Sequence, residues 1–291
     1  QTTRSQDIID RAHRCADSLK EGNGLKLFDP ADELKDAANR GDMVAMLQHA
    51  MEKDDFRLLF QPIVSLRGDS DEHYEVLVRM LNPKGEEVSP SEFIAAANDE
   101  GLTGKIDRWV VLNSIKQLGE HRSKGHNTHL FIHLSSASLQ DQTFLPWLSL
   151  ALKAERLPAD ALVMQISEPD AIEYLKQAKA LTQGLAELHC KVSINQFGCA
   201  ANPFNTLKHI NADFVRVDGS YTQDLANPEN LEALKVLLTS LHAQAQITVV
   251  PCVETATTMA ALWQTGANYI QGYFLQAPSP VMDFEFSSGN D

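Results

Sequence analysis

From Asp55 onward, the sequence alternates between short apolar segments and longer amphipathic ones. Eight apolar segments have the length of β-strands: 56–64, 73–80, 129–134, 162–167, 190–194, 213–217, 246–250 and, more weakly, 269–274. Helical spacing of apolar residues marks 91–99, 104–121, 144–155, 171–189, 229–243 and 257–265. This alternation predicts a mainly parallel sheet with helices packed outside it. Eight such units predict an α/β fold of the (β/α)8 TIM-like barrel type, which typically needs about 250 residues. An open doubly wound sheet is the alternative, although the sequence lacks its glycine-rich dinucleotide fingerprint.

Composition excludes several classes of partner. The net charge of −14 at pH 7 argues against a surface for a nucleic-acid polymer or an anionic membrane. No apolar run is long enough for membrane insertion, and no secretory signal is present. The four cysteines (Cys15, Cys190, Cys199 and Cys252) have neither zinc-site nor disulfide-framework spacing, so we expect a reducing cytoplasm.

The residues before Asp55 differ from the rest of the chain. Residues 6–20 have helical spacing, and 25–28 form a short apolar strand after a glycine-containing turn. Residues 31–54 predict a helical connector with one apolar face, made of Met43, Met46, Leu47 and Met51. We therefore divide the chain into 1–30, 31–54 and 55–291. Because the sequence opens on Gln1, we expect it to be part of a longer protein.

Polar residues stand at or near the carboxyl ends of most predicted strands. They are Glu75, His133, Gln165, Glu168, Asn195, Gln196, Arg216, Asp218, Glu254 and Gln271. Barrel active sites form at these strand ends, so the ring predicts a functional site. Glu75, Leu77 and Arg79 share one face of their strand because side chains alternate. A buried Glu and Arg need partners, so they either pair with each other or meet a ligand.

Several motifs occur in the same order as in the EAL domain family of cyclic-di-GMP phosphodiesterases and receptors. They are 61–63 (QPI), 75–79 (EVLVR), 90–94 (PSEFI), 134–135 (LS), 195–198 (NQFG), 217–218 (VD), 253–255 (VET) and 271–273 (QGY). From Asp55 to Pro280 the chain therefore resembles an EAL domain, which implies an EAL-type barrel. Residues 1–30 resemble the tail of a diguanylate-cyclase-like (GGDEF) domain and would form an N-terminal helix-and-strand arm.

The resemblance implies that the catalytic site is degenerate. Active family members hold divalent metals in a cage of oxygen ligands, and an activated water attacks the phosphodiester. The matching positions Glu75, Glu168 and Glu254 keep their acids. The other positions carry replacements, namely His133, Gln165, Asn195, Gln196, Arg216 and Pro251. An amide supplies no charge and cannot act as a base, and an arginine stays protonated. We therefore expect no catalytic residue, no cofactor and no divalent metal.

The positions that the resemblance assigns to ligand binding are better preserved. They are Gln61, Glu75, Leu77, Arg79, Pro90, Asp107, Glu254, Gln271, Tyr273 and Pro280. The planar fork of Arg79 suits phosphate oxygens, and Tyr273 offers a stacking face. Asp107 and Glu254 match family positions that contact guanine. The leading hypothesis is thus a receptor that binds cyclic-di-GMP without metal and without hydrolysing it.

Two alternatives remain at this point. One is a weak phosphodiesterase with a single transition-metal ion held by Glu75, His133 and Glu168. The other is a ligand-free scaffold for protein docking. Resemblance to receptor members linked to type IV pili and twitching motility implies a PilZ-type adaptor protein as partner. The first 50 residues are interpreted as a remnant arm, a signalling helix or a homodimer contact.

Overall fold

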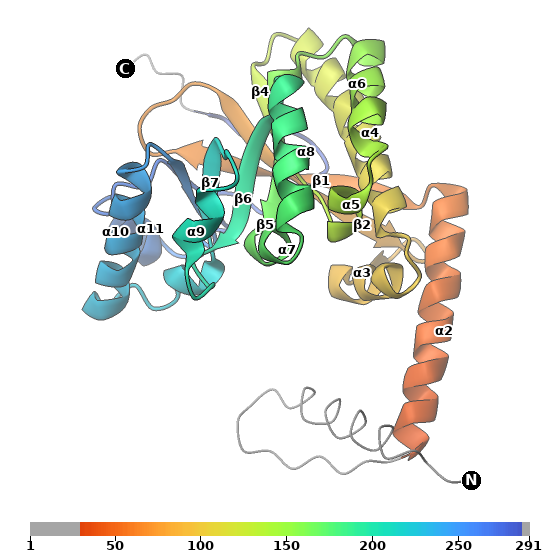
Figure 1. Cartoon of the computed structure of the whole chain (residues 1–291). Coiled ribbons are helices and arrows are strands. Elements are labelled where there is room, and N and C mark those ends of the chain that lie inside the picture. Colours follow the sequence, from red (N-terminus) through yellow and green to blue (C-terminus); the bar gives the residue numbers. More distant parts are fainter. Residues whose placement is uncertain (1–29, 287–291) are drawn as a thin grey trace.

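The computed structural model describes residues 30–286. Its central feature is a closed ring of strands with helices around most of it (Figure 1). The ring consists of β1 (Phe56–Ser65), β2 (Glu72–Leu81), β4 (Thr128–His133), β5 (Leu162–Ser167), β6 (Lys191–Phe197), β7 (Phe214–Val217), β8 (Ile247–Val250) and β9 (Tyr269–Ile270). The predicted TIM-like barrel is confirmed. The predicted GGDEF-like tail, except for Pro30, lies outside the described residues, and the division into three parts stays a prediction.

The order of strands around the ring is β1-β9-β8-β7-β6-β5-β4-β2, closed by the pairing of β1 with β2. The two-residue strand β3 (Glu87–Val88) extends β2 outside this ring. All ring neighbours are parallel except β1, which is antiparallel to both β2 and β9. The expectation of eight strand–helix units is therefore wrong at the first unit. Residues 66–71, with Gly68 at φ +78°, connect β1 to β2, too short a segment for the crossover that a parallel pair requires.

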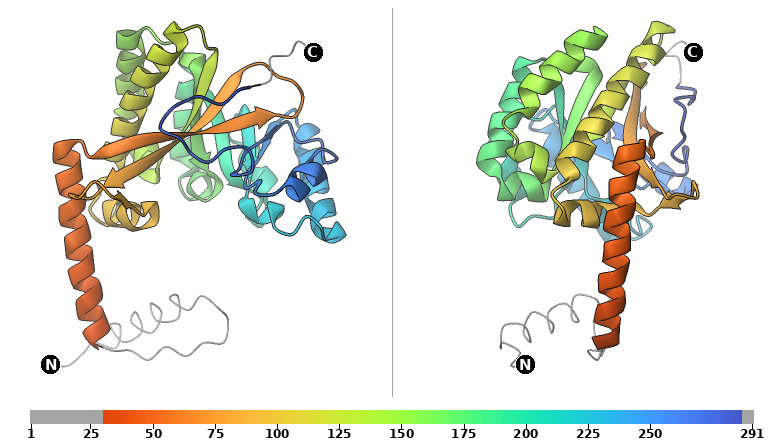
Figure 2. Two further views of the ribbon diagram at one scale, coloured as in Figure 1. Left: turned by 180° about the vertical axis from the view of Figure 1, so that it is seen from behind. Right: turned by 90° about the vertical axis from the view of Figure 1, so that its right-hand side faces the viewer.

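The C-terminal segment, residues 275–286, lies against the outer face of the β1–β2 hairpin (Figure 2). Phe60 and Ser279 exchange two backbone hydrogen bonds of 2.7 and 2.9 Å. The backbone N–H of Phe284 donates to the Tyr74 hydroxyl at 3.0 Å. The Phe286 ring packs edge-on against Tyr74, which is 1% exposed. This strap takes the place of the missing crossover helix.

The helices agree with the predicted amphipathic segments. They are α3 (Pro90–Asp99), α4 (Thr103–Ser123), α6 (Phe144–Glu155), α7 (Glu168–Glu173), α8 (Leu175–Glu187), α10 (Pro228–His242) and α11 (Ala256–Leu262). The segment predicted as one helix over 171–189 is interrupted at Tyr174, whose backbone leaves the helical region. Sequence reasoning missed the short elements α5 (Ser136–Gln140), η1 (Ala159–Ala161), α9 (Pro203–Leu207) and η2 (Gly219–Thr222). No helix in the described part of the chain could cross a lipid bilayer.

The predicted connector is helix α2 (Pro30–Lys53), which extends away from the barrel (Figure 1). Leu47 is fully buried, and Met43, Met46 and Met51 pack against the barrel's hydrophobic core. The predicted apolar face is therefore the face that docks.

Six apolar side chains, one from each of six strands, fill the inside of the barrel. We call this cluster the plug: Ile63, Phe131, Val163, Phe214, Val249 and Tyr269. On one side of the plug is the mouth, at the carboxyl ends of the parallel strands. On the other side is the base, where β2 and β4 begin. The plug separates two polar regions within one barrel.

Candidate functional site

Glu75 is the centre of a polar network at the mouth. It projects from β2 and is 9% exposed. Arg216 on β7 places Nη1 2.8 Å from Glu75 Oε1. Gln165 on β5 donates from Nε2 to the same oxygen at 3.1 Å. Gln271, directly after β9, donates from Nε2 to Oε2 at 2.7 Å. Three side chains far apart in the sequence thus converge on one carboxylate.

The network continues to β1. Gln271 Nε2 also lies 3.0 Å from Gln61 Oε1, and Gln61 Nε2 donates to the Gln276 carbonyl at 3.1 Å. Gln61 stands directly opposite Glu75 in the β1–β2 ladder, which explains why they share a face. We call Gln61, Glu75, Gln165, Arg216 and Gln271 the mouth network. Within residues 30–286, the amide oxygens of Gln165 and Gln271 accept no hydrogen bond, which leaves them to water or a ligand.

The charge of Arg216 keeps Glu75 ionised. Burial alone opposes the charged form of Glu75, but the guanidinium and the amide donors outweigh it. The pKa of Glu75 is therefore lower than its usual value. The pair is an ion pair at close distance rather than a well-aligned hydrogen bond. A cation of the protein itself thus neutralises the buried carboxylate.

Arg79 has a different environment from Glu75. Its Nε lies 3.7 Å from Glu87 Oε2, and its Nη1 donates to the Val78 carbonyl at 3.0 Å. The hypothesis that Glu75 and Arg79 pair with each other is therefore wrong, because each has its own partner. Glu87 is 42% exposed, so its long contact with Arg79 is weak. Much of the Arg79 guanidinium's hydrogen-bonding capacity remains for an anionic ligand.

Glu168 anchors the loop that follows β6. It is 1% exposed, and its Oε2 accepts a hydrogen bond from the backbone N–H of Gly198 at 3.0 Å. Burial raises the pKa of Glu168 above its usual value, and the nearby Asp218 adds to this. Backbone N–H groups of residues 198–200 act in the opposite direction and do not fully compensate. In this structure Glu168 holds a loop in place.

Asn195 and Gln196 point to different environments. Asn195 is buried, and its Oδ1 accepts a hydrogen bond from the Ser193 hydroxyl at 3.3 Å. Gln196 is exposed and has φ +54°, in the left-handed region, at an irregularity between β6 and β7. A non-glycine residue is strained there, most of all one without the short polar side chain of Asn or Asp. The two positions therefore do not form a pair of ligands.

Asp107 lies on α4 and organises the segment after β4. Its Oδ2 accepts hydrogen bonds from the Ser135 N–H at 2.9 Å, the Ser135 hydroxyl at 2.6 Å and the Ser138 hydroxyl at 2.6 Å. Burial raises the pKa of Asp107, although these three hydrogen bonds favour its charged form. The contact of Asp107 with a guanine stays a prediction.

The other predicted ligand residues lie closer to the surface. Leu77 and Pro90 are half-buried, whereas Glu254, Tyr273 and Pro280 are exposed. Tyr273 is 64% exposed, an unusual state for a large aromatic ring without a partner. The free ring face suits stacking against a base. Their direct role in binding stays a prediction.

The mouth does not fit the metal cage of active family members. Pro251 offers no side-chain ligand, and His133 is exposed at the end of β4. Within residues 30–286, no three His, Cys, Asp or Glu ligand atoms at the mouth lie within 4.8 Å of one another. Glu75, His133 and Glu168 are therefore not gathered as the single-metal alternative requires. The positive charge of Arg216 beside Glu75 further opposes a second cation.

Sequence reasoning missed the partnership of Arg216 with Glu75. The signal was present, because Arg216 stands in the apolar strand segment Phe214–Val217 and a buried guanidinium requires a carboxylate. The sequence offered several acids, however. Only the closure of the barrel decides which of them faces β7.

Comparisons with known proteins agree with this geometry. A model of the EAL domain matches residues 44–278. The chain is 31% identical over 252 residues to the cyclic di-GMP phosphodiesterase PdeF of Escherichia coli K12, covering 86% of this chain and 33% of that protein. It thus spans roughly a third of the length of the curated relatives it matches.

Two solved structures have nearly the same fold. The FimX EAL domain from Pseudomonas aeruginosa bound to c-di-GMP is 61% identical with a TM-score of 0.82, and the match covers 84% of this chain and 100% of that chain. The FimX EAL domain of Xanthomonas citri in complex with c-diGMP is 29% identical with a TM-score of 0.80, covering 89% and 100%.

Proposed function

The chain belongs to the EAL domain family, and we propose that it is a cyclic-di-GMP receptor that binds the dinucleotide at the barrel mouth without metal and without hydrolysing it. The observation that carries the proposal is the mouth network, in which Arg216 lies 2.8 Å from Glu75. In active members the corresponding Glu is a metal ligand. Here a guanidinium supplies the positive charge that a metal would bring.

The loss of hydrolysis follows from the chemistry of the replaced groups. A phosphodiester is attacked by water only if a metal or a base activates that water. Both oxygens of Glu75 already accept internal donors. Asn195, Gln196 and Arg216 cannot remove a proton from water, because amides and guanidinium are not bases. The site keeps its shape and loses its means of generating a nucleophile.

Binding requires the opposite property, namely free donors and free apolar faces. Arg79 would hold a phosphate oxygen, because one hydrogen bond to the Val78 carbonyl and a weak contact with Glu87 leave most of its guanidinium donors free. Tyr273 and Pro280, both exposed, would cover a base, and Glu254 would accept hydrogen bonds from a guanine edge. Both FimX EAL domains compared above hold the same dinucleotide, which supports this ligand.

The role of the whole protein is proposed from the group of EAL-family receptors that the sequence resembles. We propose that the bound state is read by a PilZ-type adaptor protein in control of type IV pili and twitching motility, within a longer protein that contains a GGDEF-like domain before residue 31. This assignment rests on the resemblance of the sequence motifs to receptor members of the family, whereas the two FimX EAL domains support the dinucleotide ligand.

The experiment is a calorimetric titration of this chain with cyclic-di-GMP in excess EDTA, followed by chromatography of the recovered nucleotide. We expect saturable 1:1 binding and intact nucleotide. Arg79→Ala should weaken binding by about 1.5–3 kcal/mol, the value of a hydrogen bond to a charged group. That loss corresponds to roughly 10- to 150-fold in affinity. Arg67→Gln is the matched control, because Arg67 contacts the Gly266 carbonyl at the base.

Three results would contradict the proposal. Absence of binding in EDTA, with binding restored by manganese, would mean that the ligand still requires a metal. Linear pGpG formed in manganese and lost in Glu75→Ala would establish the weak phosphodiesterase instead. Absence of binding under both conditions would favour the ligand-free scaffold.

A further inference from the structure

A second group of ionisable side chains lies at the base of the barrel, on the far side of the plug from the mouth. Asp71, His73 and His129 bring one carboxylate oxygen and two ring nitrogens within 4.8 Å of one another. His73 on β2 and His129 on β4 stand side by side in the parallel ladder, and Asp71 precedes β2 by one residue. The alternation of side chains sends all three to the same face. We call them the base triad.

His73 is buried and makes no hydrogen bond through Nδ1 to any residue that the structure describes. It is 5% exposed. The rings of Phe131, Phe214 and Tyr269 pack edge-on around it, with centroids 5.0 to 6.1 Å away. Burial, together with the neighbouring His129, lowers the pKa of His73 to about 4, so the ring is neutral at pH 7. A neutral imidazole with an unused nitrogen is costly to bury unless a ligand occupies it.

His129 is held in the orientation of a metal ligand. Its Nδ1 lies 3.0 Å from the Asp160 carbonyl, which can only accept, so Nδ1 carries the proton. In the neutral ring the lone pair is then on Nε2, which lies 3.7 Å from Asp71 Oδ2 and makes no hydrogen bond with the described residues. Metal-binding histidines commonly donate their other ring N–H to such a carbonyl.

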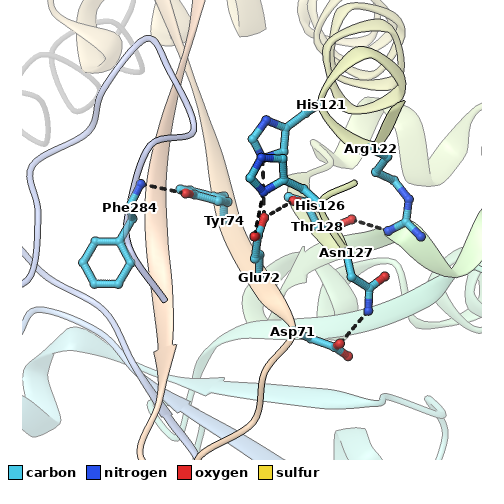
Figure 3. A network of polar contacts seen from close by, with 9 residues as sticks. All are labelled: Asp71, Glu72, Tyr74, His121, Arg122, His126, Asn127, Thr128 and Phe284. Atoms are coloured by element: carbon cyan, nitrogen blue, oxygen red, sulfur yellow. Dashed lines mark hydrogen bonds and ion pairs between the residues drawn. The ribbon is translucent and has the colours of Figure 1, made fainter. Parts of the chain in front are cut away.

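Asp71 is the third member of the group. One of its carboxylate oxygens accepts a hydrogen bond from a neighbouring side chain, and the other faces the imidazole of His129. Its Oδ1 accepts a hydrogen bond from Asn127 Nδ2 at 2.6 Å (Figure 3). The other oxygen, Oδ2, is the one that faces His129. Asp69, which accepts a hydrogen bond from the Tyr269 hydroxyl, adds negative charge close to both histidines. A cation is therefore favoured at this position.

The neighbouring group Glu72, His121 and His126 offers the same ligand types, but its carboxylate is already satisfied. His121 Nε2 lies 3.4 Å from Glu72 Oε2 and makes no hydrogen bond with the described residues. Glu72 Oε1 contacts His126 Nδ1 at 2.8 Å, and Oε2 accepts from the Thr128 hydroxyl (Figure 3). His121 and His126 stack with centroids 4.0 Å apart. Both carboxylate oxygens have internal partners, so a metal would have to break this network. The base triad has no such competition at its two imidazoles.

We propose that Asp71, His73 and His129 bind one zinc ion, with water in the fourth position. Two imidazoles and one carboxylate form a common three-ligand set for tetrahedral zinc. The bound ion would tie the start of β2 to the start of β4 and close the base of the barrel. This site lies apart from the proposed nucleotide site and needs no cyclic-di-GMP.

The test is a zinc titration of this chain by calorimetry after removal of metals with EDTA and exchange into EDTA-free buffer. We expect 1:1 binding in the wild type. His73→Phe and His129→Gln should each lower the zinc affinity by at least about 100-fold, because altering a residue that merely hydrogen-bonds to a ligand already costs about 10- to 100-fold. His126→Gln in the neighbouring group and His133→Gln at the mouth are controls that should bind as the wild type does. Cobalt substitution should give the intense visible bands of a tetrahedral site, lost in His129→Gln.

The alternative outcomes are distinct. Unchanged zinc affinity in both His73→Phe and His129→Gln, with circular dichroism confirming their fold, would overturn the proposal. Affinity lost in His126→Gln or His133→Gln instead would place the ion elsewhere. Absence of zinc binding by the wild type would overturn it as well. Binding of cyclic-di-GMP in EDTA is measured separately, so failure of one proposal leaves the other intact.

Discussion

The two ends of this barrel carry similar polar residues and satisfy them in opposite ways. At the mouth, the Glu75 carboxylate is contacted by one guanidinium and two amides, from β7, β5 and the position directly after β9. At the base, His73 and His129 each keep a ring nitrogen without a partner in the described part of the chain. A charge neutralised inside the protein needs no external ion, whereas an unpaired buried nitrogen creates a demand for one. The contrast separates the proposed metal-free nucleotide site from the candidate zinc site.

The largest expected effect is that of removing the internal cation. Arg216→Met leaves Glu75 buried without its charge partner, and breaking such a pair costs about 3–5 kcal/mol. We therefore expect the free energy of unfolding in urea to fall by this amount at pH 7. The pair is mostly buried, with side-chain exposures of 16% and 12%, so solvent screening reduces the effect only slightly.

A double variant separates the charge from the packing. Glu75→Met combined with Arg216→Met removes both charges, and it should recover most of the lost stability. A single Arg216→Met variant as stable as the wild type would mean that Glu75 finds another neutralising group. In that case internal neutralisation by Arg216 would not distinguish the mouth from the base.

A smaller effect is expected from substituting Gly272. The absence of a side chain at this position lets its backbone lie directly against the backbone of Val253. A Cβ at this position would lie 2.1 Å from the Val253 carbonyl oxygen and 2.3 Å from its nitrogen. Backbone hydrogen bonds fix Val253 to Gln271 and Phe274, so it cannot yield easily. Gly272→Ala should therefore lower the free energy of unfolding by at least about 1–3 kcal/mol. It should also weaken cyclic-di-GMP binding, because the adjacent Gln271 would be displaced.

The matched control is another glycine with free space around it. Gly119 lies within α4, and a Cβ there would meet nothing within 4 Å. Gly119→Ala should raise the free energy of unfolding by about 0.5–1 kcal/mol through helix propensity. Equal effects of the two substitutions on the free energy of unfolding would show that the backbone around Val253 moves readily to accommodate a Cβ at position 272.

The sequence predicted the barrel well because periodicity is a local signal. All eight ring strands were predicted within a few residues of their observed bounds. The orientation of β1 was not predicted, since the apolar pattern of a strand is the same in either direction. The short connection at 66–71 was the clue, because it leaves no room for a crossover helix.

The candidate site could be predicted only in part. Strand-end positions identified Glu75, Gln165, Arg216 and Gln271, and the family resemblance added Gln61. The structure brings all five together. Their pairing was beyond the sequence, because it depends on which strands face each other across the closed ring. The base triad was missed altogether. Its histidines stand at strand starts, whereas the search for chemistry concentrated on strand ends.

The pH dependence of the free energy of unfolding tests whether Glu75 is charged in the folded protein, and the expected effect is smaller. The pKa of Glu75 is lower in the folded protein than its usual value of 4.5. Its contribution to stability is therefore complete above pH 4.5 and is lost as the pH falls through the folded-state pKa. Below pH 4.5, the wild type should lose stability more steeply than Glu75→Gln, by up to about 1.4 kcal/mol per pH unit. Urea unfolding at several pH values between 3 and 7 measures this difference. Equal slopes in the two proteins would mean that Arg216 does not hold Glu75 in its charged form.

The smallest expected effect concerns His73 at the base. His73→Phe replaces an unpaired polar ring by an apolar one of similar shape, among Phe131, Phe214 and Tyr269. Burying an unsatisfied polar group costs about 1–3 kcal/mol, so removing it should leave stability in EDTA unchanged or raise it by about 1 kcal/mol. In saturating zinc the order should reverse, because only the wild type gains the free energy of binding. Thermal melts of both proteins with EDTA and with zinc provide the measurement. A loss of stability in EDTA comparable to that of Arg216→Met would mean that His73 is already satisfied, and the contrast between mouth and base would disappear.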